Sequence, residues 1–227
     1  MIGWTAIIPI KPPGLSKSRL EVEPSAREQL ARAFALDVLD AVAATSSVLQ
    51  SVVVTADTMI AAHARTRGML TVADRPMLSA EGLNDAVRVG RDWAVCRWPS
   101  SPVAVIPADL PSITSTVLGA TLERLAAAER CFVPDAGGTG TTILTSLDPA
   151  MLRPLFGPRS AFRHAEDGVR PVIEVDRRIR RDVDTVADLA ESRLHGVGCW
   201  TAAILAAERA RSHQRRLRPH HSVGVRS

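Results

Sequence analysis

Short apolar runs alternate with segments of helical periodicity along the first half of the chain. Four runs, at residues 5–10, 52–54, 70–72 and 103–106, are typical of buried strands. Between them, residues 25–42, 57–67 and 83–95 have helical spacing or residues that begin and end helices. Such an alternation of strands and helices predicts a parallel, doubly wound sheet with right-handed crossovers.

The second half of the chain has shorter elements separated by turns. We expect a helix over residues 114–129, strands over 131–133 and 172–175, and a short helix that ends near His164. Another helix is expected over residues 186–194, with Thr185 as its N-cap and Asp188 completing a capping box. A last helix starts at Gly198.

Composition fits one domain followed by a basic tail. The chain has 227 residues, of which 46% are apolar, so we expect one α/β domain over residues 1–207. The net charge is +4, and the segment from Thr201 onward carries six arginines and one glutamate, or +5. Residues 208–227 lack apolar periodicity, and we expect them to form a disordered tail.

Cysteine usage and the apolar runs indicate a cytoplasmic protein. Cys96, Cys131 and Cys199 lie far apart and form no metal-binding motif, so we expect them to be buried apolar residues in a reducing compartment. The N-terminal apolar run is too short for a signal peptide. No run reaches the about 20 apolar residues that span a membrane, so we expect no membrane partner.

Three aspartates are candidates for a metal site. Asp109 follows the buried run at residues 103–106, which places it at the carboxyl edge of the sheet, where open α/β sheets bind ligands. Asp182 and Asp184 are two residues apart, so on an extended segment their carboxylates lie on the same side. Taken alone, such a pair is more often surface or capping chemistry. Together with Asp109, the oxygen-only set suits Mg²⁺.

Two loops have compositions suited to phosphates. Residues 11–20 place three cations between a strand and a helix, although they match neither a P-loop nor a dinucleotide-binding motif. Residues 134–142 hold three glycines, which allow backbone N–H groups to approach an anion. A solvated basic loop and an ordinary glycine-rich turn are the alternatives. At Leu83-Asn84, the amide is either a helix N-cap or a contact to a base or ribose.

Cations, backbone amides and clustered carboxylates together favour phosphoryl or nucleotidyl transfer. In such reactions, positioning and charge neutralisation supply most of the rate. No Ser-His-Asp or Cys-His arrangement competes with this hypothesis.

Five motifs occur in one order along the chain: Ile-Pro-Ile-Lys-Pro-x-x-x-x-Lys-Ser-Arg-Leu at residues 8–20, Ala-Asp-Leu-Pro at 108–111, Gly-Thr-Gly-Thr-Thr at 138–142, Phe-Gly-Pro-x-Ser at 156–160 and Asp-Val-Asp-Thr-x-x-Asp-Leu at 182–189. The set resembles the 2-phospholactate/phosphoenolpyruvate guanylyltransferases, which make the guanylylated precursor of the deazaflavin coenzyme F(420). The resemblance spans Trp4 to about Leu205. One departure is Ala108, where family members often carry glycine.

The resemblance implies a fold and an activity. The fold is a single-domain nucleotidyltransferase, GT-A-like and Rossmann-like, with a mixed, mostly parallel sheet and helices on both faces. The reaction joins GMP from GTP to a phosphorylated three-carbon acid and releases pyrophosphate. Phosphoenolpyruvate is the expected acid because the motif sequences and the Ala/Arg-rich composition resemble those of the actinobacterial branch of the family, for which this acid is the expected substrate. 2-Phospho-L-lactate and 3-phospho-D-glycerate remain alternatives.

The resemblance also implies roles for individual residues. Mg²⁺, with two ions expected, is implied at Asp109, Asp182 and Asp184. The acid is assigned to Lys11, Thr141, Gly157 and Ser160. The nucleotide is assigned to Lys17, Arg19, Leu83 and Asn84, and the catalytic residues are Lys17, Arg19 and Asp109.

Other hypotheses remain open at this stage. One is a related transferase acting on a cytidylyl, molybdopterin or sugar-nucleotide substrate. Another is a nucleic-acid-binding or regulatory protein on a retained transferase scaffold, motivated by the basic tail, although a solvated tail is the more common case. An exposed apolar helix face around Trp200 suggests a homodimer.

Overall fold

The computed structural model describes residues 2–11, 20, 22–73 and 82–217, with the backbone alone described for 212–217. The first half contains β1 (Trp4–Ile10), α1 (Pro24–Ala43), β2 (Val48–Thr55), α2 (Thr58–Thr66), β3 (Leu70–Ala73), α3 (Gly82–Arg97) and β4 (Val103–Val105). The second half contains α4 (Ser115–Leu125), β5 (Arg130–Pro134), β6 (Thr141–Ser146), the 3₁₀ turn η2 (Pro149–Met151), α5 (Ser160–Glu166), β7 (Arg170–Pro171), α6 (Arg177–Arg180), α7 (Val186–Leu194) and α8 (Cys199–Leu217).

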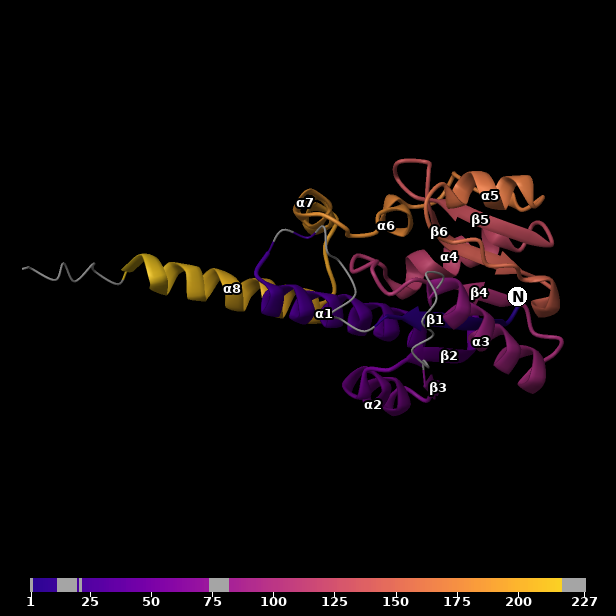
Figure 1. Ribbon diagram of the computed structural model, residues 1–227, viewed down its shortest axis with the longest axis horizontal. Coiled ribbons are helices and arrows are strands. Elements are labelled where there is room, and N and C mark those ends of the chain that lie inside the picture. Colours follow the sequence, from indigo (N-terminus) through magenta and orange to yellow (C-terminus); the bar gives the residue numbers. More distant parts are fainter. Residues whose placement is uncertain (1, 12–19, 21, 74–81, 218–227) are drawn as a thin grey trace, which may run out of the picture.

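The strands form one seven-stranded sheet in the order β3-β2-β1-β4-β6-β5-β7 (Figure 1). β3, β2, β1 and β4 are parallel, whereas β6 runs antiparallel to both β4 and β5. This is the expected mixed, mostly parallel sheet of a single α/β domain.

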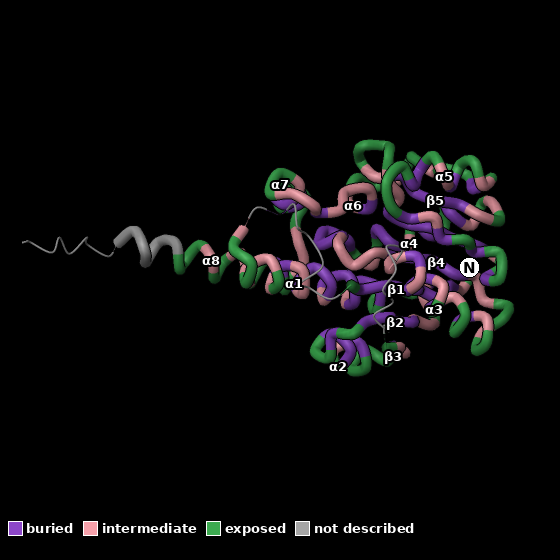
Figure 2. Tube along the Cα trace, in the orientation of Figure 1, coloured by how far each residue is buried: buried purple, intermediate pink, exposed green. Residues whose placement is uncertain are grey.

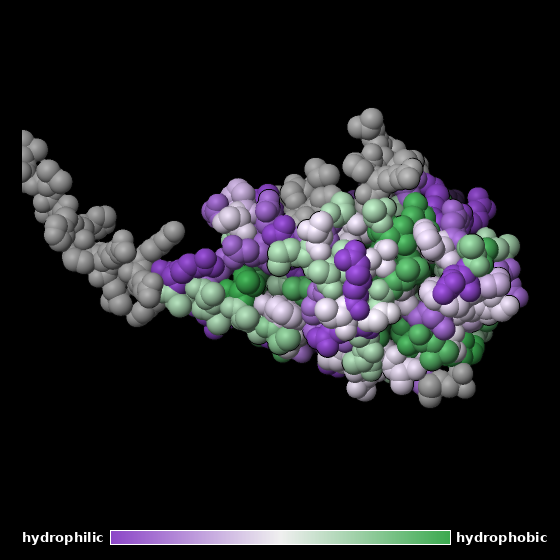
Figure 3. All heavy atoms as spheres, turned by 90° about the horizontal axis from the view of Figure 1, so that it is seen from below, coloured by the Kyte–Doolittle hydropathy of each residue, from purple (hydrophilic) through white to green (hydrophobic). Residues whose placement is uncertain are grey.

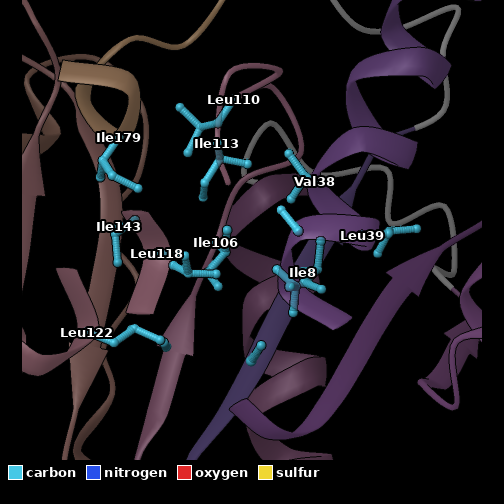
Figure 4. Packing of buried hydrophobic residues seen from close by; sticks show 14 of the residues in the cluster. Ile8, Val38, Leu39, Ile106, Leu110, Ile113, Leu118, Leu122, Ile143 and Ile179 are labelled. Atoms are coloured by element: carbon cyan, nitrogen blue, oxygen red, sulfur yellow. The ribbon is translucent and has the colours of Figure 1, made fainter. Parts of the chain in front are cut away.

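Alternate residues of the central strands face two different helical layers. Ile8 of β1 and Ile106 after β4 belong to the larger core, which packs against α1, α2 and α4 (Figure 4). Ile7 and Val105, one position away on the same strands, belong to a second core under α3 and α5. Burial on both faces explains why these strands read as continuous apolar runs. Figure 2 shows the same result as a buried band along β1, β2 and β4.

Helix α8 projects from one end of the sheet, beside α1 (Figure 1). Its N-terminus is capped by Asp37 of α1, which accepts hydrogen bonds from the backbone N–H groups of Trp200 at 2.9 Å and Thr201 at 3.0 Å. Gly198 is required at this junction because a Cβ there would lie 2.2 Å from Asp37. The unpaired amides that begin every helix are thus partly satisfied by another helix.

Asp40, one turn further along α1, makes a second set of contacts. It accepts from the Trp200 indole Nε1 at 3.0 Å and pairs with His63 Nε2 at 2.7 Å and Arg67 Nε at 2.9 Å. His63 also packs edge-on against the Trp200 ring, with centroids 5.5 Å apart. We call Asp37, Asp40 and these partners the α8 anchor. Trp200, although 39% exposed, is therefore tied to its own chain, and the homodimer remains a prediction.

One predicted strand is wrong. Residues 172–175 leave the sheet after the bond from Val172 N–H to the Phe132 carbonyl at 2.9 Å, so β7 ends at Pro171. The next bond of this parallel ladder would run from the N–H of residue 134 to the Val172 carbonyl, but residue 134 is a proline and has no N–H. β5 therefore offers no further donor to this edge.

The predicted start of the disordered tail, residue 208, is also wrong. α8 continues to Leu217, because Ala, Arg, Glu, Gln and Leu are good helix formers and no helix breaker occurs before Pro219. Residues 218–227 lie outside the described part of the chain. The assignment of residues 1–207 to the nucleotidyltransferase domain stays a prediction.

Three further results concern the cysteines, the helices and the surface. Cys131 is buried as expected, but Cys96 and Cys199 are exposed, and all three cysteines are free. Within the described residues, no helix is both long enough and apolar enough to cross a membrane. On the face drawn in Figure 3, hydrophobic residues form separate patches among hydrophilic ones.

Candidate active site

Asp109, Asp182 and Asp184 come together, as expected, although more than 70 residues separate the first from the others in the sequence. One carboxylate oxygen from each lies within 4.8 Å of the other two, and all three residues are partly buried. We call this group the aspartate triad. Like charges at such distances repel, so the three carboxylates together favour a bound cation.

A backbone contact holds the two parts of the aspartate triad together. Val183 N–H donates to the Asp109 carbonyl at 3.0 Å, and the Val183 side chain is fully buried. Because successive side chains of an extended segment point to opposite sides, burial of Val183 turns Asp182 and Asp184 together toward the opposite side. The valine of the Asp-Val-Asp motif thus orients both carboxylates.

The predicted capping box fixes the segment on its other side. Thr185 N–H donates to Asp188 Oδ2 at 2.8 Å, and Asp188 N–H donates to Thr185 Oγ1 at 3.2 Å. The same Asp188 oxygen also accepts from Asp184 N–H at 3.3 Å. The N-terminus of α7 therefore sets the position of Asp184.

The donor set of the aspartate triad fits a hard divalent cation. Carboxylate oxygens are the ligands of Mg²⁺ and Ca²⁺, and Mg²⁺ commonly takes one or two of them together with water and substrate phosphates. Ligands at about 2.1 Å in octahedral geometry lie roughly 3 Å from one another. Oxygens already within 4.8 Å reach such spacing through small side-chain movements.

Strand register places two more candidates at this edge of the sheet. β1 and β4 are parallel with Ile7 opposite Val105, so Lys11 and Asp109, each four residues further on, leave the sheet at the same edge. β6 is antiparallel, with Leu144 opposite Val105, so its first residue, Thr141, lies at that edge too. The carboxyl edge therefore carries a lysine, a carboxylate and a hydroxyl on three neighbouring strands.

A tight turn at residues 156–160 lies next to Thr141, and we call it the Gly157 turn. Gly157 has φ +118°, a conformation that favours glycine, and Arg159 is left-handed at φ 56°. Ser160 is 2% exposed and starts α5. Ala161 N–H donates to the Thr139 carbonyl at 3.1 Å, which joins the turn to the start of β6.

Asn84 does not act as an N-cap. Its amide lies 7% exposed inside α3, where Oδ1 accepts from Phe156 N–H at 2.8 Å and Nδ2 donates to the Phe156 carbonyl at 3.1 Å. Arg163 Nη2 donates to the same carbonyl at 2.8 Å. Asn84 thus holds the Gly157 turn, and its contact with the nucleotide stays a prediction. Leu83 packs against the second core.

The glycine-rich turn at residues 134–142 already contains its own anion. The Asp135 carboxylate accepts from Thr139 N–H at 2.9 Å and from Gly140 N–H at 2.8 Å. These amides therefore face a side chain of the protein, which differs from the expected exposed anion site. Thr141 remains available at the end of this turn, but as a side-chain hydroxyl.

His164 is a residue that sequence reasoning missed. It is fully buried on α5, with Nδ1 at 2.9 Å from Thr141 Oγ1 and Nε2 at 3.1 Å from the Leu155 backbone N. Burial, reinforced by the charges of Arg163 and Arg130, lowers the pKa of His164 to about 4, so the ring is neutral near pH 7. Its spacing of four from Ser160, one helical turn, was the only available signal.

Lys17 and Arg19 fall outside the described residues, so their predicted contacts with GTP phosphates stay predictions. Lys11 is described and exposed. The structure thus brings together Asp109, Asp182 and Asp184, and joins Thr141 to the Gly157 turn through His164.

Comparisons with known proteins agree on the fold. A nucleotidyl transferase from Methanothermobacter thermautotroptrophicus aligns with a TM-score of 0.57 at 17% identity, over 85% of this chain and 97% of that one. A cytidylyltransferase from Leptospira borgpetersenii aligns with a TM-score of 0.54 at 12% identity, over 97% and 100% of the two chains. The expected nucleotidyltransferase fold is confirmed.

Sequence comparisons identify the family. The phosphoenolpyruvate guanylyltransferase of Salinispora arenicola is 39% identical over 205 residues, covering 88% of this chain and 92% of that protein. The protein of the same name from Streptomyces scabiei is 39% identical over 210 residues, covering 89% and 96%. The family described as "Guanylyl transferase CofC like" matches residues 4–217. This chain therefore belongs to the CofC-like guanylyl transferase family.

Proposed function

We propose that this protein transfers the guanylyl group of GTP to phosphoenolpyruvate, giving enolpyruvyl-diphospho-5′-guanosine and pyrophosphate in coenzyme F(420) biosynthesis. The observation that carries the proposal is the aspartate triad, found at the carboxyl edge of the sheet in a member of a guanylyl transferase family. The choice of acid is supported by the relatives, which are named phosphoenolpyruvate guanylyltransferases.

The chemistry needs positioning more than proton transfer. A phosphate oxygen of the acid forms a bond to the α-phosphorus of GTP, and the bond from that phosphorus to the bridging oxygen breaks. Its electron pair leaves with pyrophosphate. An ionised phosphate is already a nucleophile, so no general base is required, which agrees with a neutral, buried His164. The residues act by alignment and charge neutralisation.

The aspartate triad serves the nucleotide side of this reaction. Mg²⁺ held by Asp109, Asp182 and Asp184 would supply charge neutralisation at the phosphates. Two ions are proposed, since two-metal sites stabilise both the attacking and the leaving oxygen. Lys17 and Arg19 are proposed to contact the GTP phosphates, and Leu83 with Asn84 the nucleoside.

The other side of the site is proposed to bind the acid. Thr141 and Ser160 offer hydroxyl groups, Gly157 allows close approach of the backbone, and Lys11 offers a positive charge at the same edge of the sheet. Phosphate and carboxylate groups only accept hydrogen bonds, so a set of donors suits a phosphorylated acid.

The test is incubation with GTP, Mg²⁺ and one acid at a time, with pyrophosphate release measured and the product identified by mass. We expect product with phosphoenolpyruvate, and kcat/KM at least about tenfold lower with 2-phospho-L-lactate or 3-phospho-D-glycerate, which is a difference of about 1.4 kcal/mol. CTP in place of GTP is the control for the nucleotide.

Two different outcomes would contradict the proposal. Absence of pyrophosphate with all three acids overturns guanylyl transfer. Faster turnover with 2-phospho-L-lactate or 3-phospho-D-glycerate overturns the choice of acid and leaves the reaction type in place.

A further inference from the structure

His164 is a polar side chain in an apolar place. Its ring lies between Phe132 and Phe156, with centroid distances of 5.6 and 5.4 Å, and is fully buried. The proposed reaction needs no general base, so proton transfer does not explain this histidine. Buried polar groups are hydrogen-bonded, so the partners of the His164 ring are expected to show its role.

The hydrogen bonds of His164 fix its tautomer. The Leu155 backbone N–H, 3.1 Å from Nε2, can only donate, so Nε2 must be the unprotonated acceptor. A neutral imidazole carries one proton, which then resides on Nδ1.

The tautomer determines the role of Thr141. Nδ1 lies 2.9 Å from Thr141 Oγ1, and because Nδ1 carries a proton, the hydroxyl oxygen must be the acceptor in this contact. The hydroxyl hydrogen therefore points away from the imidazole. Thr141 is partly exposed at the carboxyl edge of the sheet, so this hydrogen is available to a ligand there.

We infer that His164 is a positioning residue: by donating from Nδ1 to Thr141, it presets the Thr141 hydroxyl as a donor to an anionic oxygen of the acceptor acid. The same ring holds Leu155, immediately before the Gly157 turn, so one side chain aligns two parts of the acid site. The inference rests on the proposed function for the identity of the ligand. The tautomer itself does not depend on that function.

The first test compares KM values in a double-mutant cycle. Thr141→Val removes the donor and is expected to raise KM for phosphoenolpyruvate about tenfold or more, since hydrogen bonds to charged groups are the strong ones. His164→Phe is expected to raise the same KM several-fold, with KM for GTP unchanged. In the Thr141→Val background, His164→Phe should add less than about twofold, because coupled residues are not additive.

Two variants serve as controls. His164→Gln retains one acceptor and one donor, so it should lie closer to the wild type than His164→Phe. His164→Leu replaces His164→Phe in the cycle if that variant fails to fold. His63→Gln alters a histidine of the α8 anchor and should leave KM for the acid unchanged. Additive effects, or equal increases in both KM values, would overturn the inference.

The second test reads the tautomer directly and needs no activity. In protein with ¹⁵N-labelled histidine, the ring signals absent from His164→Gln belong to His164. We expect a neutral ring protonated at Nδ1 between pH 6 and 8. Protonation at Nε2 would overturn the inference even if the guanylyl transfer is confirmed. Nδ1 protonation in a protein without guanylyl transfer would leave the positioning of Thr141 standing and refute the proposed function alone.

Discussion

The α8 anchor and the aspartate triad use the same residue type for opposite purposes. In the anchor, Asp37 and Asp40 accept hydrogen bonds from backbone amides, an indole, an imidazole and a guanidinium of their own chain. In the triad, three carboxylates converge within 4.8 Å of one another. The first arrangement stabilises the fold, whereas the second accumulates negative charge that a cation relieves. The convergence of like charges, rather than sequence position, distinguishes the functional aspartates from the structural ones.

The largest expected effect is a loss of guanylyl transfer when the aspartate triad is changed, with no such loss when the α8 anchor is changed. Asp109→Asn should lower kcat for guanylyl transfer at least about 100-fold, because it removes a charged ligand from the site of phosphate chemistry. Its melting temperature without metal should stay close to that of the wild type, since the backbone contact from Val183 N–H to the carbonyl of residue 109 is kept. Asp37→Asn is the matched control and should retain kcat per folded molecule. Near-normal turnover by Asp109→Asn would refute the triad as a metal site.

The next effect is a loss of stability at low pH, caused by His164 beside the proposed binding site for phosphoenolpyruvate. Burial lowers the pKa of His164 to about 4 from its usual 6.5, so between these pH values the unfolded state binds a proton that the folded state does not. The contribution of the neutral ring to the unfolding free energy is therefore fully present above pH 6.5 and is lost as the pH falls toward 4. The loss in unfolding free energy is at most roughly 3 kcal/mol, at about 1.36 kcal/mol per unit. Urea titrations between pH 7 and 4 measure it. His164→Gln should remove this part of the pH dependence, and an unchanged slope would contradict it.

A smaller effect is expected from Asp37→Ala. The substitution removes both acceptors for the first amides of α8 and should lower the unfolding free energy by about 1–2 kcal/mol, the range for lost helix caps. Chemical denaturation measures the change. Asp37→Asn keeps one acceptor oxygen and should lose less. Reduced turnover without reduced stability would place Asp37 with the functional carboxylates instead.

The smallest effect is expected at very low pH in the anchor. Although burial opposes it, hydrogen bonds from Trp200 and His63 lower the pKa of Asp40, so its contribution is present above about pH 4 and is lost below it. Burial raises the pKa of Asp37, so the contribution of Asp37 to the unfolding free energy changes above about pH 4, outside the pH range in which Asp40 acts. Asp40→Asn should therefore flatten the stability profile only below pH 4, and a change near neutrality would contradict this.

The aspartate triad could be predicted because its determinants are local. A buried apolar run before Asp109 gives the sheet edge, alternation puts Asp182 and Asp184 on one side, and Thr185 with Asp188 forms a cap within four residues. Each rule depends only on neighbours in the sequence. The mixed direction of the strands was implied by the family resemblance rather than by periodicity, and their order emerged only from the structure.

Other features depend on contacts that spacing does not encode. Asn84 looked like a cap, but its partner is Phe156, 72 residues away. The glycine-rich turn looked open to an anion, but Asp135 supplies one internally. The strand expected after Pro171 fails because the next ladder bond would need an N–H on Pro134 of the neighbouring strand. In each case a tertiary contact overrides a local pattern.

Binding of a divalent cation tests the central claim most directly. Mn²⁺ in place of Mg²⁺ can be titrated into the wild type, Asp182→Asn and Asp37→Asn with GTP present, and free Mn²⁺ measured by electron paramagnetic resonance. We expect Asp182→Asn to weaken binding by about tenfold or more, as loss of a ligand must cost at least as much as loss of a residue that only orients one. Asp37→Asn should bind like the wild type. Equal binding by the wild type and Asp182→Asn would contradict the assignment of the aspartate triad.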